Sequence, residues 1–434
     1  MSKEKSLGFW SVVAIGIGGM VGGGIFAVLG LAVELSHGGT PLAFLLAGLV
    51  ALITSYSYAK LSVKYPSQGG TVEFLNKSFG SGFTTGSFNV LLFISYIVML
   101  SLYAYAFGSY AASFFPVEVQ SLWRHIFTSI IIIALTGLNI LGARAVGKFE
   151  EAIVAFKIFI LLVFISVGIL SVNTQNLQPT TWTSPLSLIA GGMIIFVAYE
   201  GFELIANTAE DVKNPGKILP RAYYFSVIFV IFLYMMVALV TVGNLPLDQI
   251  IAAKDYALAA AAKPFLGMLG FVLIAIAALL STGSAINATL YGTSRVSYII
   301  AKEGELPQQL ERKIWNKPLE GLLITSAITL IIANLFNVSQ IATMGSAGFL
   351  IIFAAVNASN FNLHKSTKSS RYISLLGLIT CTGALVALVL QTLFTNPLDI
   401  WILILLVLSS VIIEFIYQKT TGRKIRGIYS KLKK

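Results

Sequence analysis

Three charged side chains stand inside apolar stretches of the sequence, where charge is costly. Lys157 lies in EEAIVAFKIFILLVFISVG (150–168), and Glu200 and Glu203 lie in GGMIIFVAYEGFELIANTAEDVKNPGKILPRA (191–222). If these stretches cross a bilayer, a lysine there costs at least ~2.5 kcal/mol, and residues of this kind usually relay protons or compensate another charge. The alternative for Lys157 is a long side chain that reaches the polar surface of the membrane. We favour a role for Lys157 in moving or balancing charge.

A run of glycines is the second chemical signal. AIGIGGMVGGGIFAVLG (14–30) has six glycines in the nine positions from Gly16 to Gly24. Each interior glycine costs a helix roughly 0.5–1 kcal/mol relative to alanine. Close Gly-xxx-Gly packing of helices is the alternative explanation, but two or three glycines would serve it. We therefore predict that the helix unwinds here and that its backbone faces a water-filled cavity, where irregular structure is tolerated in a membrane.

An unwound helix presents two kinds of backbone group to a ligand. The amides of Gly22, Gly23 and Gly24 would begin the second half-helix and could hold a carboxylate. Carbonyl groups before this break and around 196–199 could accept hydrogen bonds from an ammonium group. A site with both halves recognises the backbone of a free amino acid. The candidate substrate-binding residues are Met20, Gly22, Gly23, Gly24, Phe196, Val197, Tyr199, Glu200 and Glu203.

The composition places these stretches in a membrane. The chain has 434 residues, of which 56% are hydrophobic and only 11% charged, whereas soluble proteins carry about a quarter charged residues. Apolar runs of about 18–25 residues, long enough to cross a bilayer as helices, occur along the whole chain. Twelve spans are predicted, at about 9–35, 41–63, 83–113, 125–142, 149–171, 185–209, 220–243, 266–299, 320–336, 338–358, 373–394 and 397–418. The predicted class is an all-α polytopic membrane protein.

The charges predict the orientation in the membrane. All but four of the 29 Lys and Arg residues fall in the tails and loops of one side, and the exceptions are Lys157, Arg124, Lys254 and Lys263. This asymmetry predicts a plasma-membrane protein with both termini in the cytoplasm. It also argues that the net charge of +11 reflects membrane orientation and not binding of nucleic acid. The basic tail 419–434 is expected to be solvated rather than bound to lipid, and Glu414 is expected at the membrane interface.

Metal and cofactor chemistry is not expected. Cys381 is the single cysteine, and His37, His125 and His364 are too scattered for ligand spacing. No histidine cluster, nucleophile with flanking carboxylates or phosphate-binding loop indicates an enzyme. The segment 244–267 is alanine-rich but interrupted by charges, so we expect a helical cap on the outer membrane surface.

Two broken spans in corresponding positions are typical of transporters built from inverted repeats. The motifs GIGGMVGGGIF (16–26) and FVAYEGFELIANTAEDVKNPGKILPRA (196–222) resemble the amino acid–polyamine–organocation superfamily, closest to its proton-coupled amino acid transporters. The similarity covers essentially the whole chain and includes GNLPLDQIIAAKDYALAAAAKPFLG, SAINATLYG and AKEGELP. The resemblance implies one domain over 1–434 with a LeuT-type fold. Its parts would be a first repeat at 9–171, a second repeat at 185–358, two extra helices at 373–418 and a basic tail.

The resemblance also implies roles for particular residues. Gly22, Gly23 and Gly24 would bind the substrate carboxylate, and the segment 196–200 would accept hydrogen bonds from its amino group. Glu203 has its usual place in GFE, but an apolar residue commonly stands at Glu200. This extra acid would either select cationic substrates or bond to the broken backbone.

Lys157 matches a lysine that, in similar transporters, stands where sodium-coupled relatives hold a sodium ion. Its ammonium group would replace the ion, and burial would favour release of its proton during the cycle, so protons rather than sodium are the expected coupling ion. Ser281, Thr282 and Ser284 of LLSTGSAINATLYG (279–292) are candidates to face this ammonium group. The alternative is that these hydroxyl groups bond across helices.

The predicted function is import of amino acids, of broad specificity, by proton symport through alternating access. Exchange of amino acids or polyamines without net proton movement is the alternative, and Glu200 keeps it open. A membrane sensor of amino acids without transport is a third hypothesis. The sequence leaves the oligomeric state open.

Overall fold

The computed structural model describes residues 6–80, 82–141, 146–303 and 319–421. Within these residues the chain is almost entirely helical, with two isolated β-bridges. Ten helical segments are long and apolar enough to cross a membrane, and the bent pair α1 and α2 can form an eleventh. α12 (Leu319–Leu335) is a shorter apolar helix. The all-α polytopic class is confirmed, whereas the number of twelve crossings stays a prediction.

Each predicted span coincides with a helical segment in the described part of the chain. The other long helices are α3 (Thr40–Lys64), α5 (Phe83–Ala112), α6 (Val117–Leu141), α7 (Val146–Gly168), α9 (Pro215–Asn244), α11 (Ala257–Glu303), α13 (Val338–Asn362), α15 (Arg371–Thr395) and α16 (Ile400–Thr421), of which α11 is kinked near its start. Shorter helices between them are α4 (Thr71–Phe79), α10 (Leu247–Ala252) and α14 (His364–Thr367). The basic tail beyond Thr421 and the part of the AKEGELP stretch after Glu303 lie outside the described residues.

The first predicted span is broken at the glycine run. α1 (Phe9–Met20) ends one turn before α2 (Gly24–Ser36) begins, and the two axes differ by 45°. Gly23 caps α2 but offers no side chain to its first amides, so these amides are not satisfied by a cap. The predicted break is confirmed.

The second break lies at the acidic motif. The α-helix α8 (Pro185–Ile194) gives way to 3-10 helix in η4 (Ile195–Tyr199) and η5 (Phe202–Asp211). Gly201, between them, has φ +117°, a conformation that side-chain-bearing residues rarely adopt. The sequence therefore departs from regular α-helix just where Glu200 and Glu203 stand.

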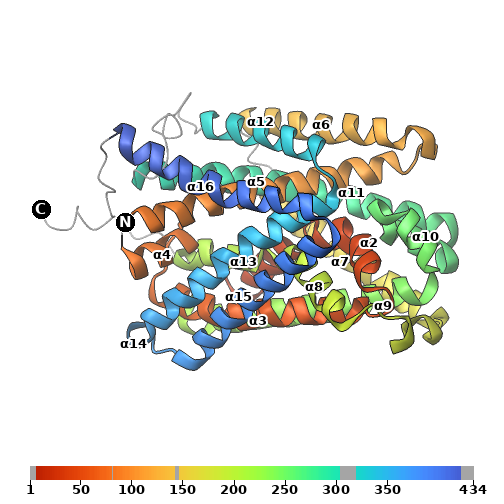
Figure 1. Ribbon diagram of the computed structural model, residues 1–434, viewed down its shortest axis with the longest axis horizontal. Helices are drawn as coiled ribbons and strands as arrows, with labels where there is room; N and C mark the ends of the chain where they lie inside the picture. The colour runs from red at the N-terminus through yellow and green to blue at the C-terminus, as the bar shows by residue number, and fades with distance from the viewer. Residues whose placement is uncertain (1–5, 81, 142–145, 304–318, 422–434) are drawn as a thin grey trace, which may run out of the picture.

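The helices form a core with a lipid-facing shell. In the most apolar 18-residue stretch of α5, 89% of the residues are buried, and the share is the same in the broken span 185–211. In the corresponding stretch of α6 the share is 17%, and in those of α15 and α16 it is 28%. α6 and α12 lie together along one long side of the molecule, and α16 runs along α5 (Figure 1). The core helices thus hold the two breaks while the outer helices present apolar side chains to lipid.

Glu414 of α16 is part of this packing. Its side chain is 0% exposed and lies against Gly86 of α5, and its carboxyl group accepts a hydrogen bond of 2.8 Å from Gln418. Gly86 of α5 leaves room for this carboxyl group between the two helices, and the level of Glu414 in the membrane stays a prediction.

A helical cap covers the half-helix α2. α10, the 3-10 turn η6 (Lys254–Tyr256) and the start of α11 precede a kink at Gly267, whose φ is +64°. Lys254 of the cap forms an ion pair of 3.3 Å with Glu34 at the end of α2, and Tyr105 of α5 donates a hydrogen bond of 3.2 Å to Asp255. The segment 244–267 is helical as predicted, and its position at the membrane surface stays a prediction.

At the opposite end, α1 and η5 are tied through their backbones. The amides of Ser6 and Leu7 donate to the Asp211 carbonyl at 3.0 Å, and the amide of Lys213 donates to the Leu7 carbonyl at 3.0 Å. Leu7 and Val212 thereby form a parallel β-bridge. α1 and η5 are therefore joined at the ends that lie away from the two breaks.

Candidate substrate and coupling site

The two breaks cross each other in direct backbone contact. A Cβ atom added to Gly19 would lie 2.8 Å from the Gly201 carbonyl oxygen, and one added to Gly24 would lie 2.7 Å from Ala198 Cα. Both distances are far below van der Waals contact, so only glycine fits. The glycines thus serve close packing as well as the break, and the two explanations drawn from the sequence hold together.

Side chains of neighbouring helices satisfy the carbonyl groups that the breaks release. The Tyr234 hydroxyl of α9 lies 2.6 Å from the Met20 carbonyl and 3.2 Å from the Ala198 carbonyl, so it bridges the two broken spans. Ser346 of α13 accepts from the Val197 amide at 2.9 Å and donates to the Ile194 carbonyl at 2.6 Å. These contacts make irregular backbone tolerable at membrane depth.

Lys157 also reaches the first break. Its Nζ donates a hydrogen bond of 3.1 Å to the Gly18 carbonyl, and its side chain is 1% exposed. The ammonium group is thus directed at the released backbone of α1 and not at the molecular surface. This geometry favours the charge-balancing role over the surface-reaching alternative.

The three hydroxyl groups predicted to face Lys157 occupy different places. Ser281 donates to the Val21 carbonyl at 2.9 Å and contacts the Gly22 carbonyl as well. Thr282 donates to Ala278 within its own helix at 2.7 Å, and Ser284 lines the cavity described below. Ser281 therefore supports the break itself, and a pairing of these residues with Lys157 stays a prediction.

The two glutamates are buried, with exposed fractions of 4% for Glu200 and 1% for Glu203. Glu203 accepts a hydrogen bond of 2.8 Å from the Gly201 amide and one of 3.4 Å from the Tyr96 hydroxyl. Glu200 accepts one of 3.1 Å from the Tyr103 hydroxyl. Glu203 thus bonds to the broken backbone, the role that the sequence left open for Glu200, whereas Glu200 points elsewhere.

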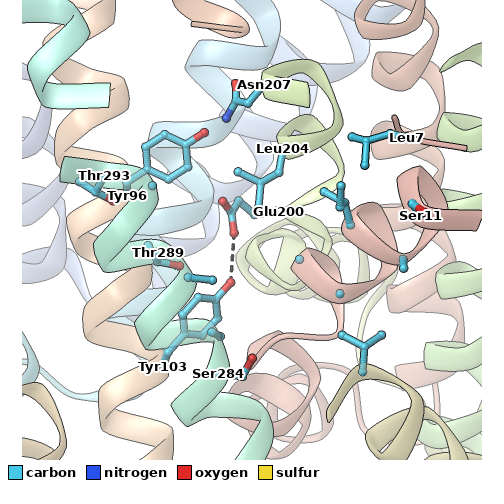
Figure 2. Close-up of a pocket in the computed structure, with 18 residues that line it drawn as sticks. Leu7, Ser11, Tyr96, Tyr103, Glu200, Leu204, Asn207, Ser284, Thr289 and Thr293 are labelled. Carbon is cyan, nitrogen blue, oxygen red and sulfur yellow. Dashed lines mark hydrogen bonds between the residues drawn. The ribbon is translucent and has the colours of Figure 1, made fainter. Parts of the chain in front are cut away.

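Glu200 points into a cavity of about 250 Å³ (Figure 2). The cavity lies between α1 and η5 on one side and α5 and α11 on the other, with Val154 of α7 at its wall. Its lining is mostly small or apolar, with hydroxyl and amide groups among it, and consists of Leu7, Ser11, Ala14, Ile15, Gly18, Gly19, Tyr96, Tyr103, Val154, Glu200, Leu204, Asn207, Ser284, Ala285, Ala288, Thr289, Gly292 and Thr293. Among these residues Glu200 is the one acidic or basic side chain.

Most predicted substrate residues lie just behind this lining. Met20, Gly22, Gly23, Gly24, Phe196, Val197, Tyr199 and Glu203 are buried and are not among the lining residues. A Cβ on Gly23 would collide with the Tyr103 ring, and one on Gly22 would lie 3.1 Å from Ala285 Cβ. Tyr103 and Ala285 both line the cavity, so these two side chains pack between it and the Cα atoms of the two glycines.

The chain matches a known family over nearly its whole length. Residues 7–416 match the model of the amino acid permease family. The chain belongs to this family. It is 38% identical to an uncharacterized protein of Methanocaldococcus jannaschii, with 97% of each chain covered. It is 35% identical to the inner membrane transport protein YbaT of Escherichia coli, with 86% of this chain and 87% of that protein covered. It is 25% identical to the branched-chain amino acid permease BcaP of Bacillus subtilis, with 84% and 82% covered.

The permease is therefore a membrane transporter of an amino acid permease family and not an enzyme. Several residues of its site had no signal in the sequence, chiefly Tyr96, Tyr103, Asn207, Tyr234 and Ser346. Tyrosine, serine and asparagine occur in membrane helices for many packing reasons, so residue type alone did not single them out.

Proposed function

We propose that this permease imports amino acids of broad specificity together with protons, by alternating access around the two breaks. The protein would lie in the plasma membrane with both termini in the cytoplasm. The observation that carries the coupling proposal is the hydrogen bond from Lys157 Nζ to the Gly18 carbonyl beside the first break. A buried ammonium group in this place can neutralise backbone dipoles in one conformation and release its proton when α1 moves.

The substrate's backbone groups would bind where the breaks leave polar groups without regular partners. The uncapped amides at the start of α2 would donate hydrogen bonds to the carboxylate, as helix N-termini do to anions in general. Carbonyl groups of the breaks keep a second lone pair beyond the hydrogen bonds they accept and would bind the ammonium group. The substrate side chain would occupy the cavity, which requires Tyr103 or Ala285 to move from above the glycines.

The closed and open ends of the molecule support alternating access. The cavity lining follows α1 from Gly19 at the break down to Leu7, at the end predicted to face the cytoplasm. At the other end the cap closes over α2 through the Lys254–Glu34 ion pair. Opening outward would require this contact to separate and the cavity to close.

The backbone bridge predicts that α1 and η5 move as one body. In a variant with Cys381 replaced by alanine, a disulfide between Leu7→Cys and Val212→Cys is expected to leave uptake close to the uncrosslinked rate. Partners in a β-bridge lie close enough for a disulfide without backbone movement. The measurement is uptake of a labelled amino acid into proteoliposomes before and after oxidation.

A pair across the cavity provides the matched control. Ser11 and Thr289 stand on opposite walls (Figure 2), so joining Ser11→Cys to Thr289→Cys with a short thiol crosslinker is expected to slow uptake by about tenfold or more. If the Leu7–Val212 crosslink stopped uptake as strongly, the two half-helices would have to separate during transport, and the single-body movement would be wrong.

The transport proposal itself is tested by uptake of a labelled amino-acid mixture into proteoliposomes. An inward proton gradient without sodium is expected to drive accumulation above the outside concentration. A requirement for sodium, or for amino acid or polyamine preloaded inside, would contradict proton symport, and the second result would favour exchange. Binding without any uptake would favour the sensor hypothesis.

A further inference from the structure

Glu200 has no assigned part in the cycle described above. Neither the family match nor the contact of Lys157 with α1 uses its carboxyl group. Figure 2 shows Glu200 between Tyr96 and Tyr103, facing the cavity from the turn before η5. A buried acid that faces a cavity is unusual, because an unpaired carboxylate in such a place is strongly disfavoured.

The hydrogen bonds of Glu200 indicate how this cost is reduced. Both carboxyl groups are buried, three residues apart in one motif. Burial and a neighbouring acid favour the neutral form of a carboxyl group. Glu203 accepts from the Gly201 amide at 2.8 Å and from Tyr96 at 3.4 Å, whereas Glu200 accepts from Tyr103 at 3.1 Å. Glu203, with more donors, is therefore better suited to hold a negative charge, and Glu200 is the group expected to hold a proton.

The side chains around the two glutamates supply no positive charge to Glu200 from the cavity. The titratable side chains bonded to the pair are Tyr96 and Tyr103 of α5. The hydroxyl groups of Tyr58 of α3 and Tyr223 of α9 bond instead to Thr71 and Ser62. The ammonium group of Lys157, on α7, bonds to the Gly18 carbonyl. No Lys, Arg or His is among the residues that line the cavity, so a positive group at Glu200 from that side must come with the substrate.

We propose that Glu200 makes the permease prefer amino acids whose side chain is positively charged, and that such a substrate displaces the proton held by Glu200. The proton passes to water in the cavity, and the ammonium or guanidinium group of the substrate takes its place beside the carboxylate. No bond within the substrate changes. A neutral side chain binds with Glu200 still protonated, and an acidic side chain meets a carboxyl group with no basic residue beside it. The inference rests on the proposed function, because it concerns the side-chain end of the same substrate site.

Lysine and norleucine form a matched pair of ligands, since norleucine has the same carbon chain without the ammonium group. Binding of each to the purified full-length protein is measured for the wild type, Glu200→Gln and Glu118→Gln. Wild-type protein is expected to bind lysine at least about tenfold more tightly than norleucine. Glu200→Gln should remove this preference and keep the affinity for norleucine. Glu118 is exposed on α6, so Glu118→Gln should behave as the wild type.

Proton release gives a second readout that needs no variant. In weakly buffered solution with a pH indicator, lysine binding to the wild type is expected to release about one proton per site, and norleucine none. Equal affinities for the two ligands, or lysine binding without proton release, would overturn the inference and leave amino acid transport standing. A wild-type protein that neither binds nor takes up either ligand would overturn the proposed function and this inference together.

Discussion

Replacing Lys157 with alanine is expected to abolish proton-driven uptake, down to the level of liposomes without protein. The substitution removes a buried ammonium group that donates to the Gly18 carbonyl, 3.1 Å away. Without the ammonium group, no proton can be carried at this position. The Gly18 carbonyl also loses a charged donor, and a hydrogen bond of this kind contributes about 1.5–3 kcal/mol. The measurement is uptake of a labelled amino acid under an imposed inward proton gradient.

A matched control is Lys365→Ala, which removes an exposed lysine of α14, away from the site. Exposed substitutions of this kind usually change stability by no more than about 0.5 kcal/mol, so uptake by this variant is expected to remain proton-driven. Size-exclusion profiles in detergent separate a coupling defect from failure to fold. Undiminished proton-driven uptake by folded Lys157→Ala would show that the lysine is structural only, and another group would then have to carry the proton.

Replacing Gly201 with alanine is expected to destabilise the permease by at least about 2 kcal/mol and to remove uptake. The cause is twofold. Alanine is strained at φ +117°, and its Cβ would meet the backbone of Gly19 and lie 2.6 Å from the Met20 amide nitrogen. Backbone atoms cannot rotate away as a side chain could, so the crossing of the two breaks would have to open. Thermal unfolding of the purified protein, followed by loss of the monodisperse peak, measures the effect.

Gly137→Ala is the matched control for this substitution. Gly137 lies in the interior of α6, with nothing within 4 Å of an added Cβ, so alanine there is expected to be neutral or to stabilise the helix by about 0.5–1 kcal/mol. An unchanged unfolding midpoint and uptake rate for Gly201→Ala would mean that the two breaks do not depend on this contact.

The sequence by itself determined the class of the protein and the places where its helices break. Hydropathy and helix propensity are local properties, so runs of apolar residues and a cluster of six glycines between Gly16 and Gly24 act where they stand. The cost of a charge in an apolar segment is equally local, which is why Lys157 could be singled out and is found buried against the first break. For Glu414, near the end of its helix, the sequence predicts only the level in the membrane, and the structure adds that its side chain is buried against α5.

Only the tertiary structure decided which groups meet at the site. Tyr234 bridges Met20 and Ala198 across separations of 214 and 36 residues, and Ser346 bonds to η4 from 149 residues away. No local pattern fixes such pairs, because they depend on how α9 and α13 pack against the breaks. The same holds for the two glutamates: three residues apart in one motif, they differ in role because Gly201 turns the backbone between them. Glu203 is thereby directed to the Gly201 amide and Glu200 to the cavity.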